Sequence, residues 1–373
     1  TESKSIAAGP SAAKMRDAGI DHIRVVLTSL VIFHHVAIVY GGSGGWYWRE
    51  QPDASNQILL MFNAVNQAFF MGFFFLLAGY FTPSSYERKG GGRYLRDRVL
   101  RLGVPLLFYF FLLSPFTVAL SRIGEGGSFW RSWLEAIQAG EFGPGPLWFA
   151  EALLLFAGTY AVWCRLRPAH KIVRELPRFR ALALTAFSLS VVSFLVRLVM
   201  PTGKEFAWMQ IGYFPCYILL FAAGCAACRT NLLEKVTIRQ ALPWMIVSLM
   251  AILTLPVIIL FRSGKGPFEG GWSINAFFYA LWDPLVAWGV ILGMLWAFRT
   301  YLSQAVSLTD WLARNAYGAY IVHPPIVVGA SLAAVTWTLG PLPKFAIVGT
   351  TACVISFLAA AVLRAIPGAR KIL

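Results

Sequence analysis

The fold is decided by residues 23–40, IRVVLTSLVIFHHVAIVY, an apolar run long enough to cross a bilayer as one helix. Arg24 and His35 lie eleven residues apart in it, which is close to three helical turns, so both side chains share one face. Asp21 belongs to the same face, whereas His34 points about 100° away. Ionisable groups at membrane depth are costly unless they line a cavity or have partners. The segment therefore predicts a functional site inside a membrane.

The composition agrees with a membrane protein. Hydrophobic residues make up 58% of the 373 residues, charged residues only 13%, and the mean hydropathy is +0.63. A soluble domain carries about twice that charged fraction. The net charge of +15 is concentrated between the hydrophobic segments. This placement argues against a nucleic-acid partner and for the lipid bilayer.

Ten hydrophobic runs have the length of a transmembrane helix, which predicts an all-α polytopic membrane protein. They are residues 23–41, 58–82, 99–120, 146–164, 181–201, 209–228, 240–261, 273–298, 316–337 and 344–363. With a cytoplasmic N-terminus, 24 Lys and Arg residues fall on the inner side and seven on the outer side, and Arg197 remains within a span. This asymmetry follows the positive-inside rule and predicts that both termini are cytoplasmic.

We expect a polar N-terminal tail at residues 1–20, followed by one membrane domain at residues 21–373. The tail has no apolar core, so the first span is expected to act as the targeting signal. The five cysteines are odd in number and lie in spans or at inner ends, which argues against a disulfide framework. Cys225 and Cys228 form a C-x-x-C without a second ligand pair, so we expect close helix packing there and no metal site.

The longest outer connections, residues 42–57 and 121–145, are rich in Gly and Trp. Two interpretations of these tryptophans remain open. They are an interfacial aromatic belt, which we favour, or a stacking platform for a sugar, with Trp46 as its first candidate.

Arginines gather where the third span enters the membrane. Arg93 and Arg96 are explained by the positive-inside rule alone. Arg98 and Arg101 lie three residues apart on a shared helix face, and guanidinium groups match phosphate oxygens. This pattern supports two interpretations equally. The arginines bind a phosphate-bearing ligand, or they only set the orientation of the span in the membrane.

Two polar clusters follow in later spans. Trp148 and Glu151 lie three residues apart at the outer start of the fourth span. Tyr320 and His323 lie three apart in the ninth, near its inner half, and the prolines at 324 and 325 free backbone groups beside His323. One membrane histidine often has only a packing role. Two histidines, an acid and several arginines on different spans indicate a site.

In order along the chain, five motifs resemble the landmarks of the acyltransferase-3 family of integral membrane acyltransferases. They are D21-H-I-R24 with His35, FFFLLAGYF, R96-D-R98-V-L-R101-L-G-V-P, P-L-W148-F-A-E151 and N315-A-Y317-G-A-Y320-I-V-H323-P. Nearly the whole chain takes part, and it looks like the group that succinylates periplasmic glucans. Ala78 departs from the family, which often has serine there, and Asp283 stands where related chains often have glutamate.

The resemblance implies transfer of an acyl group, acetyl or succinyl, from cytoplasmic acyl-CoA to a hydroxyl of an extracytoplasmic glycan or similar acceptor. His35 is the candidate general base, since a neutral imidazole can take the hydroxyl proton. Asp21 and Arg24 would orient its helix and the donor, and Arg98 and Arg101 would hold the CoA phosphates. Glu151, Tyr320 and His323 would position acceptor or thioester. Trp148 and Trp46 are expected to bind substrate.

Further expectations concern access and location. The cavity should run continuously from the cytoplasm to His35, with the acceptor arriving from the outer side. The expected location is the inner (plasma) membrane.

The alternative function is a proton-coupled transporter or flippase, since buried His, Glu and Arg also build proton relays. A non-enzymatic lipid or polymer scaffold is a third, weaker interpretation.

Overall fold

The computed structural model describes residues 18–166, 175–262, 266–304 and 306–373. Within these ranges the chain is helical and has no strand beyond one isolated bridge between Phe206 and Met209. Ten helical segments in the described residues are long and apolar enough to cross a membrane. The predicted all-α fold and its ten spans are therefore confirmed.

The spans agree with the expected runs to within a few residues at most ends. They are α1 (Ala18–Val39), α2 (Gln57–Lys89), the composite third span (Gly91–Ile123), the fourth span (Gly145–Leu166, including α7, Trp148–Leu166), α8 (Phe179–Val199), the sixth span (Ile211–Thr230, including α9, Phe214–Ala227), α10 (Ile238–Arg262), α11 (Ile274–Tyr301), α12 (Ser307–Ala333) and α13 (Pro341–Ala365). A short amphipathic helix, α6 (Phe129–Gln138), precedes the fourth span. α1 already begins at Ala18, inside the expected tail, and residues 1–17 lie outside the described residues.

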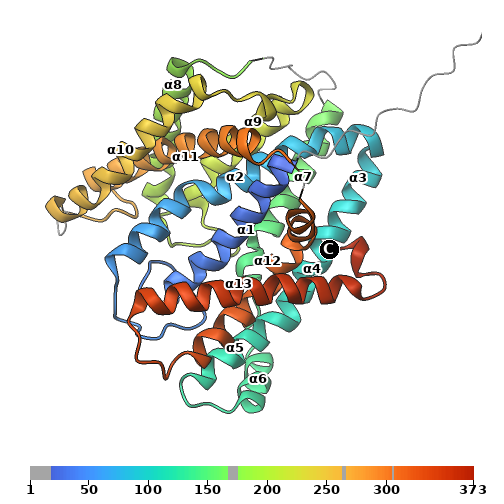
Figure 1. Cartoon of the computed structure of the whole chain (residues 1–373), viewed down its shortest axis with the longest axis vertical. Helices are drawn as coiled ribbons and strands as arrows, with labels where there is room; N and C mark the ends of the chain where they lie inside the picture. Colours follow the sequence, from blue (N-terminus) through green and yellow to red (C-terminus); the bar gives the residue numbers. More distant parts are fainter. Residues whose placement is uncertain (1–17, 167–174, 263–265, 305) are drawn as a thin grey trace, which may run out of the picture.

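α1 lies at the centre of the bundle, where it packs against α2, α11, α12 and α13 (Figure 1). α2 continues the core by packing against α9 and α11, and α11 in turn packs against α8 and α10. α1 and α12 are mostly buried, whereas α10 is mostly exposed. Two residues predicted to be functional, His35 and His323, are thus carried by neighbouring central helices.

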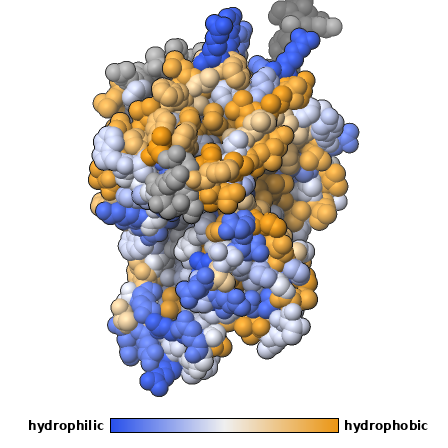
Figure 2. Space-filling model, turned by 90° about the vertical axis from the view of Figure 1, so that its left-hand side faces the viewer, coloured by the Kyte–Doolittle hydropathy of each residue, from blue (hydrophilic) through white to orange (hydrophobic). Residues whose placement is uncertain are grey.

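The outside of the bundle is apolar over large areas. Much of the upper part of the face in Figure 2 is hydrophobic, and hydrophilic side chains gather toward its lower end. On α10, Ile246, Leu249 and Leu253 are each more than half exposed. Such areas are unfavourable in water and are expected to contact lipid. The chain is a multi-pass membrane protein.

The third span is an α-helix interrupted twice by π-helical turns, at Val99–Gly103 and Tyr109–Leu113. Pro105 lies just after the first of them and has no N–H, so the carbonyl of Arg101 loses its usual donor four residues on. The hydroxyl of Tyr317 on α12 donates to that carbonyl at 2.8 Å. The irregular turn therefore ties the third span to the helix that carries His323.

His323 is not near the inner half of the ninth span, which corrects the sequence-based expectation. α12 begins at Ser307, nine residues before the expected start of that span. His323 is the seventeenth of its 27 residues and reaches the level of His35, which is the eighteenth residue of α1. The longer helix therefore places both histidines at the same depth.

Candidate active site

The two histidines form a directly hydrogen-bonded pair. Nδ1 of His35 lies 2.9 Å from Nε2 of His323, and the two rings are nearly parallel, 13° apart. His323 is fully buried, whereas His35 is partly exposed and lines a cavity. Of the pair, His35 is therefore the histidine that a substrate can reach.

The proline after His323 determines how this pair shares its protons. Pro324 has no N–H, so the carbonyl of Tyr320 loses its helical donor. Nδ1 of His323 lies 2.6 Å from that carbonyl and must carry a proton to donate to it. Nε2 of a neutral His323 is then an acceptor for Nδ1–H of His35, which leaves the lone pair of His35 on Nε2. Pro324 and these two hydrogen bonds together identify Nε2 of His35 as the basic atom.

A tight turn after α1 brings Trp46 back over His35. The turn uses Gly41 at φ +112°, and the N–H of Gly42 donates to the carbonyl of Ala37 at 2.7 Å. A side chain at Gly42 would lie 2.1 Å from the buried amide oxygen of Asn63, so only glycine fits. The ring of Trp46 consequently stacks on His35 with 4.0 Å between ring centres.

His35 lies in a cavity of about 710 Å³. His34, His35, Asn63, Gln67 and Phe70 come from α1 and α2 and belong to its deeper lining. The more exposed lining comes from the connections after α1, before α9 and before α11: Ser43, Gly44, Gly45, Thr202, Gly203, Glu205, Trp208, Phe268 and Glu269. We call this second group the mouth. It lies on the side of the membrane that the charge pattern predicts to be outer.

Tyr320, Trp148 and Trp46 line the same cavity as His35. The hydroxyl of Tyr320 donates to the carbonyl of Pro146, and Trp148 packs nearly parallel to Tyr217. These contacts fix the wall beside the histidine pair, where the ring centres of Tyr320 and His323 lie 5.8 Å apart. Four of the residues singled out in the sequence are therefore brought together here, with His323 directly behind His35.

Two tyrosines also meet here, of which Tyr47 belongs to the aromatic loop that the sequence offered as a belt or a sugar platform and Tyr109 was not singled out. The hydroxyl groups of Tyr47 and Tyr109 are 2.9 Å apart, and Tyr47 lines the cavity. Burial raises the pKa of Tyr47 above its ordinary value, so this phenol stays a neutral hydrogen-bond donor. Nothing in the sequence beyond the aromatic loop around Tyr47 could have signalled the pair.

The remaining predicted residues lie away from this cavity. Glu151 follows Trp148 by one turn but does not line it. Asp21 pairs with Arg24 at 3.3 Å on α1. Arg98 lies over the ring of Tyr94, and the side chain of Arg101 is exposed. None of these five side chains contributes to the lining around His35.

The predicted cytoplasmic route to His35 is consequently not part of this cavity. Its lining includes neither Arg24, Arg98 nor Arg101, and its exposed residues lie at the mouth. Arg24 is also eleven residues from His35 on the same helix, about 16 Å along the axis at 1.5 Å per residue. The histidine pair and the arginines form two separate regions.

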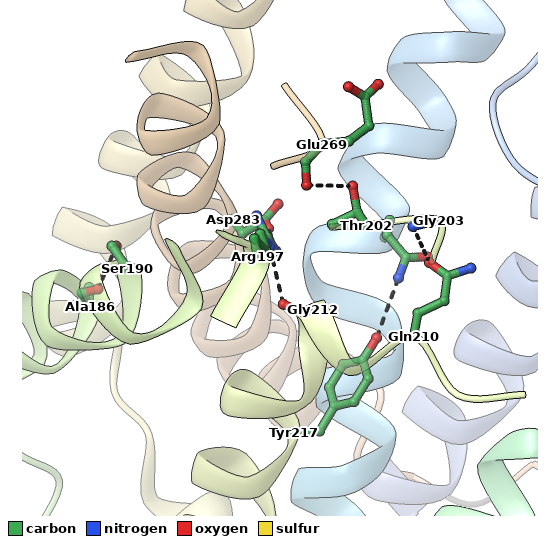
Figure 3. Close-up of polar contacts among 11 residues, drawn as sticks. Ala186, Ser190, Arg197, Thr202, Gly203, Gln210, Gly212, Tyr217, Glu269 and Asp283 are labelled. Carbon is green, nitrogen blue, oxygen red and sulfur yellow. Dashed lines mark hydrogen bonds and ion pairs between the residues drawn. The ribbon is translucent and has the colours of Figure 1, made fainter. Parts of the chain in front are cut away.

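One wall of the cavity is supported by a buried ion pair. Arg197 on α8 and Asp283 on α11 lie 2.5 Å apart, and the side chain of Arg197 is 2% exposed. Its guanidinium donates to the carbonyl of Gly212 (Figure 3). It also lies over the rings of Tyr213 and Tyr279, which line the cavity. The sequence already showed Arg197 as a charged residue inside a span. It marked Asp283 only as a departure from the family, and not as the partner of Arg197.

The arrangement suits base catalysis on a hydroxyl group. Nε2 of His35 has the lone pair, and His323 can disperse the charge that forms when His35 takes a proton. The cavity is large enough for a sugar-sized substrate. Among the described residues, no three His, Cys, Asp or Glu side chains gather to hold a metal ion.

Comparison with known proteins gives a family for most of the chain. Residues 17–361 match the acyltransferase-3 family, described as an acyltransferase domain. No solved structure matches the chain significantly.

Curated relatives match a shorter stretch. "Glucans biosynthesis protein C" of Salmonella schwarzengrund (strain CVM19633) is 31% identical over 116 residues. The proteins of the same name from Salmonella paratyphi B and Salmonella heidelberg are 30% identical over the same length. These matches cover 31% of this chain and 29% of each relative.

Proposed function

This chain belongs to the acyltransferase-3 family of integral membrane acyltransferases, and we propose that it transfers an acyl group from acyl-CoA to a hydroxyl of a glycan. The observation that carries the proposal is the His35–His323 hydrogen bond at the floor of the cavity. The relatives named for glucan biosynthesis support a glycan as acceptor. We place the protein in the inner membrane, with the mouth on the outer side.

In the proposed reaction, Nε2 of His35 removes the proton of the acceptor hydroxyl as its oxygen attacks the acyl carbonyl. The thioester bond breaks, the acyl–oxygen bond forms, and the thiolate of CoA leaves and takes the proton back from His35. His323 keeps His35 in the required tautomer, and the face of Trp46 limits how its ring can turn. Tyr47 and Tyr320 are positioned to contact the acceptor or the thioester.

We assign the CoA phosphates to Arg98 and Arg101, with Arg24 on the same predicted side, because guanidinium forks match phosphate oxygens. Asp21 positions Arg24 through their ion pair. The pantetheine arm would then have to reach from these arginines toward His35. Since the arginines lie outside the lining of the cavity at the mouth, donor and acceptor would approach the histidine from opposite sides. Glu151 stays a candidate for positioning the thioester.

The test is a panel of acyl-CoAs incubated with purified protein in detergent, with and without a gluco-oligosaccharide. Mass spectrometry should detect free CoA and an oligosaccharide heavier by the acyl group. A transporter or flippase using the same groups as a proton relay would release no CoA without a gradient. No CoA release from any member of the panel would refute acyl-CoA as donor.

A further inference from the structure

Two of the three connections that build the mouth of the cavity are tied to each other. The N–H and the hydroxyl of Thr202 both donate to the carbonyl of Glu269, at 2.9 and 3.3 Å (Figure 3). Gly203 donates to the side-chain oxygen of Gln210 at 3.2 Å. The connection between α8 and α9 and the one before α11 therefore form a single frame, and it is anchored to the wall that contains Arg197.

Trp208 is held at the mouth by a backbone conformation that is unusual for its residues. Phe206 and Met209 exchange two backbone hydrogen bonds, at 2.9 and 3.0 Å, around Ala207 and Trp208. Both central residues have positive φ, +47° and +59°, in a turn that normally requires glycine or asparagine. The ring of Trp208 rests edge-on against Phe110, yet 48% of the residue remains exposed. The turn therefore holds a half-exposed indole in the lining of the cavity.

The charged side chains that line the mouth are both acidic in the part of the chain that the structure describes. Apart from the histidines, the charged residues in the cavity lining are Glu205 and Glu269. Both are exposed, and Glu269 accepts a hydrogen bond from the N–H of Phe268 at 3.1 Å. The other polar groups of the lining are uncharged amides and hydroxyls, such as those of Gln67, Thr202 and Gln210.

We propose that the mouth is a subsite for an uncharged sugar ring, with Trp208 as its stacking face and Glu205 and Glu269 as acceptors for its hydroxyls. This assignment rests on the proposed glycan acceptor and adds a selectivity. The negative face of an indole complements the weakly positive C–H groups of a sugar ring. Two carboxylates accept hydrogen bonds from hydroxyl groups and repel acidic sugars. The subsite therefore selects neutral acceptors over anionic ones.

The test is calorimetric binding in detergent without any acyl donor. The probes are a short neutral gluco-oligosaccharide and the same oligosaccharide oxidised to carry one uronic acid. The wild-type protein should bind the neutral probe at least about tenfold more tightly at low salt, where like-charge repulsion is least screened. Equal affinity for the two probes, or no binding of the neutral probe, would overturn the subsite.

Two variants, each with a matched control, test whether Trp208 and the two glutamates cause the binding and the discrimination between the probes. Trp208→Ala should weaken binding of the neutral probe by about tenfold. Trp130→Ala should not, because Trp130 is 67% exposed on α6 and lies outside the cavity lining. Replacing Glu205 and Glu269 with Gln should reduce the discrimination between the probes, whereas Glu125→Gln, another exposed acid outside the lining, should keep it.

Equal loss in Trp208→Ala and Trp130→Ala, or unchanged discrimination after both Glu→Gln replacements, would also contradict the proposal. The proposed function is judged by a different readout, which is CoA release from acyl-CoA when a glycan acceptor is supplied in excess. Failure of the subsite with CoA release intact would refute this selectivity alone. Failure of CoA release with probe binding intact would refute the acyl-CoA reaction alone.

Discussion

His34 and His35 are neighbours in the sequence and both line the cavity, but only His35 has a partner that orients it. Nδ1 of His34 is buried and, among the described residues, makes no hydrogen bond, and its ring packs on Phe70. A general base needs a lone pair held toward the substrate, so the pairing with His323 distinguishes the two.

His35→Ala should therefore reduce acyl transfer by about 10²–10⁴-fold, the usual effect of removing a general base. His34→Ala should have a much smaller effect, since that ring lacks an orienting partner. Initial rates measured at equal amounts of folded protein decide between them. A large loss in His34→Ala with activity kept in His35→Ala would reverse the assignment.

Pro324 offers a test of the hydrogen-bond chain that leaves both histidines in place. Pro324→Ala restores an N–H that competes with His323 for the carbonyl of Tyr320. Transfer should fall by about 10–100-fold, as when a partner that fixes a histidine ring is lost. Pro325→Ala is the matched control, because it restores a donor to Ile321 instead. If both variants keep full activity, the proline does not set the tautomer of His323.

At the scale of elements, the contact between α2 and α9 depends on close backbone approach. A Cβ at Gly224 would lie 2.1 Å from the carbonyl oxygen of Leu76, and one at Gly79 would lie 2.1 Å from that of Phe221. Small residues at such contacts are typical of helix packing in membranes, where burial of apolar surface does not drive association. The two helices cannot separate without moving the cavity wall that includes Gln67 and Tyr217.

Gly224→Ala should accordingly destabilise the protein by about 1–3 kcal/mol, the cost of overpacking a close contact. Gly158→Ala on α7 is the control, because a Cβ there meets no atom within 4 Å and alanine favours the helix. Thermal unfolding in detergent, followed by circular dichroism, should show a lower melting temperature for the first variant alone. Similar melting temperatures would show that the α2–α9 contact is not tight.

The Arg197–Asp283 pair joins α8 to α11 inside the membrane region. Arg197→Met leaves Asp283 as a buried unpaired carboxylate and should cost about 3–5 kcal/mol. The double variant Arg197→Met/Asp283→Leu removes both charges and should recover most of that loss. The melting temperatures of the single and double variants provide the comparison. If the double variant is no more stable than Arg197→Met, the unpaired charge of Asp283 is not the cause of the instability.

For the whole molecule, the sequence was sufficient to predict the number of spans and most of their ends. The length of a hydrophobic run indicates directly whether it crosses the membrane as a helix, because every backbone polar group in lipid must find its hydrogen-bond partner within the helix. It also placed His35 and the proline-flanked His323 among the candidates. Their contact was not predictable, since helix α12 starts earlier than its hydropathy suggests and no pattern within one helix reveals which helix packs beside it.

The same limit explains what was missed at the mouth. Trp208 follows two ordinary residues, and neither its positive φ nor its place in the cavity lining is visible in the sequence.

The route from the arginines to His35 was inferred from charge and length alone. The cavity reaches His35 from the mouth and does not include the arginines. The cavity therefore gives the proposed acceptor a route to His35, and the proposed donor site lies outside its lining.

The most direct measurement uses protein reconstituted in one orientation into vesicles. Isotope-labelled acyl-CoA is supplied only on the face that carries Arg98 and Arg101, and a neutral gluco-oligosaccharide only on the face of the mouth. Mass spectrometry should find labelled acyl-oligosaccharide on the mouth side, with about 10²–10⁴-fold less from His35→Ala. Product that forms only when both substrates share one face, or that forms undiminished in His35→Ala, would contradict the account.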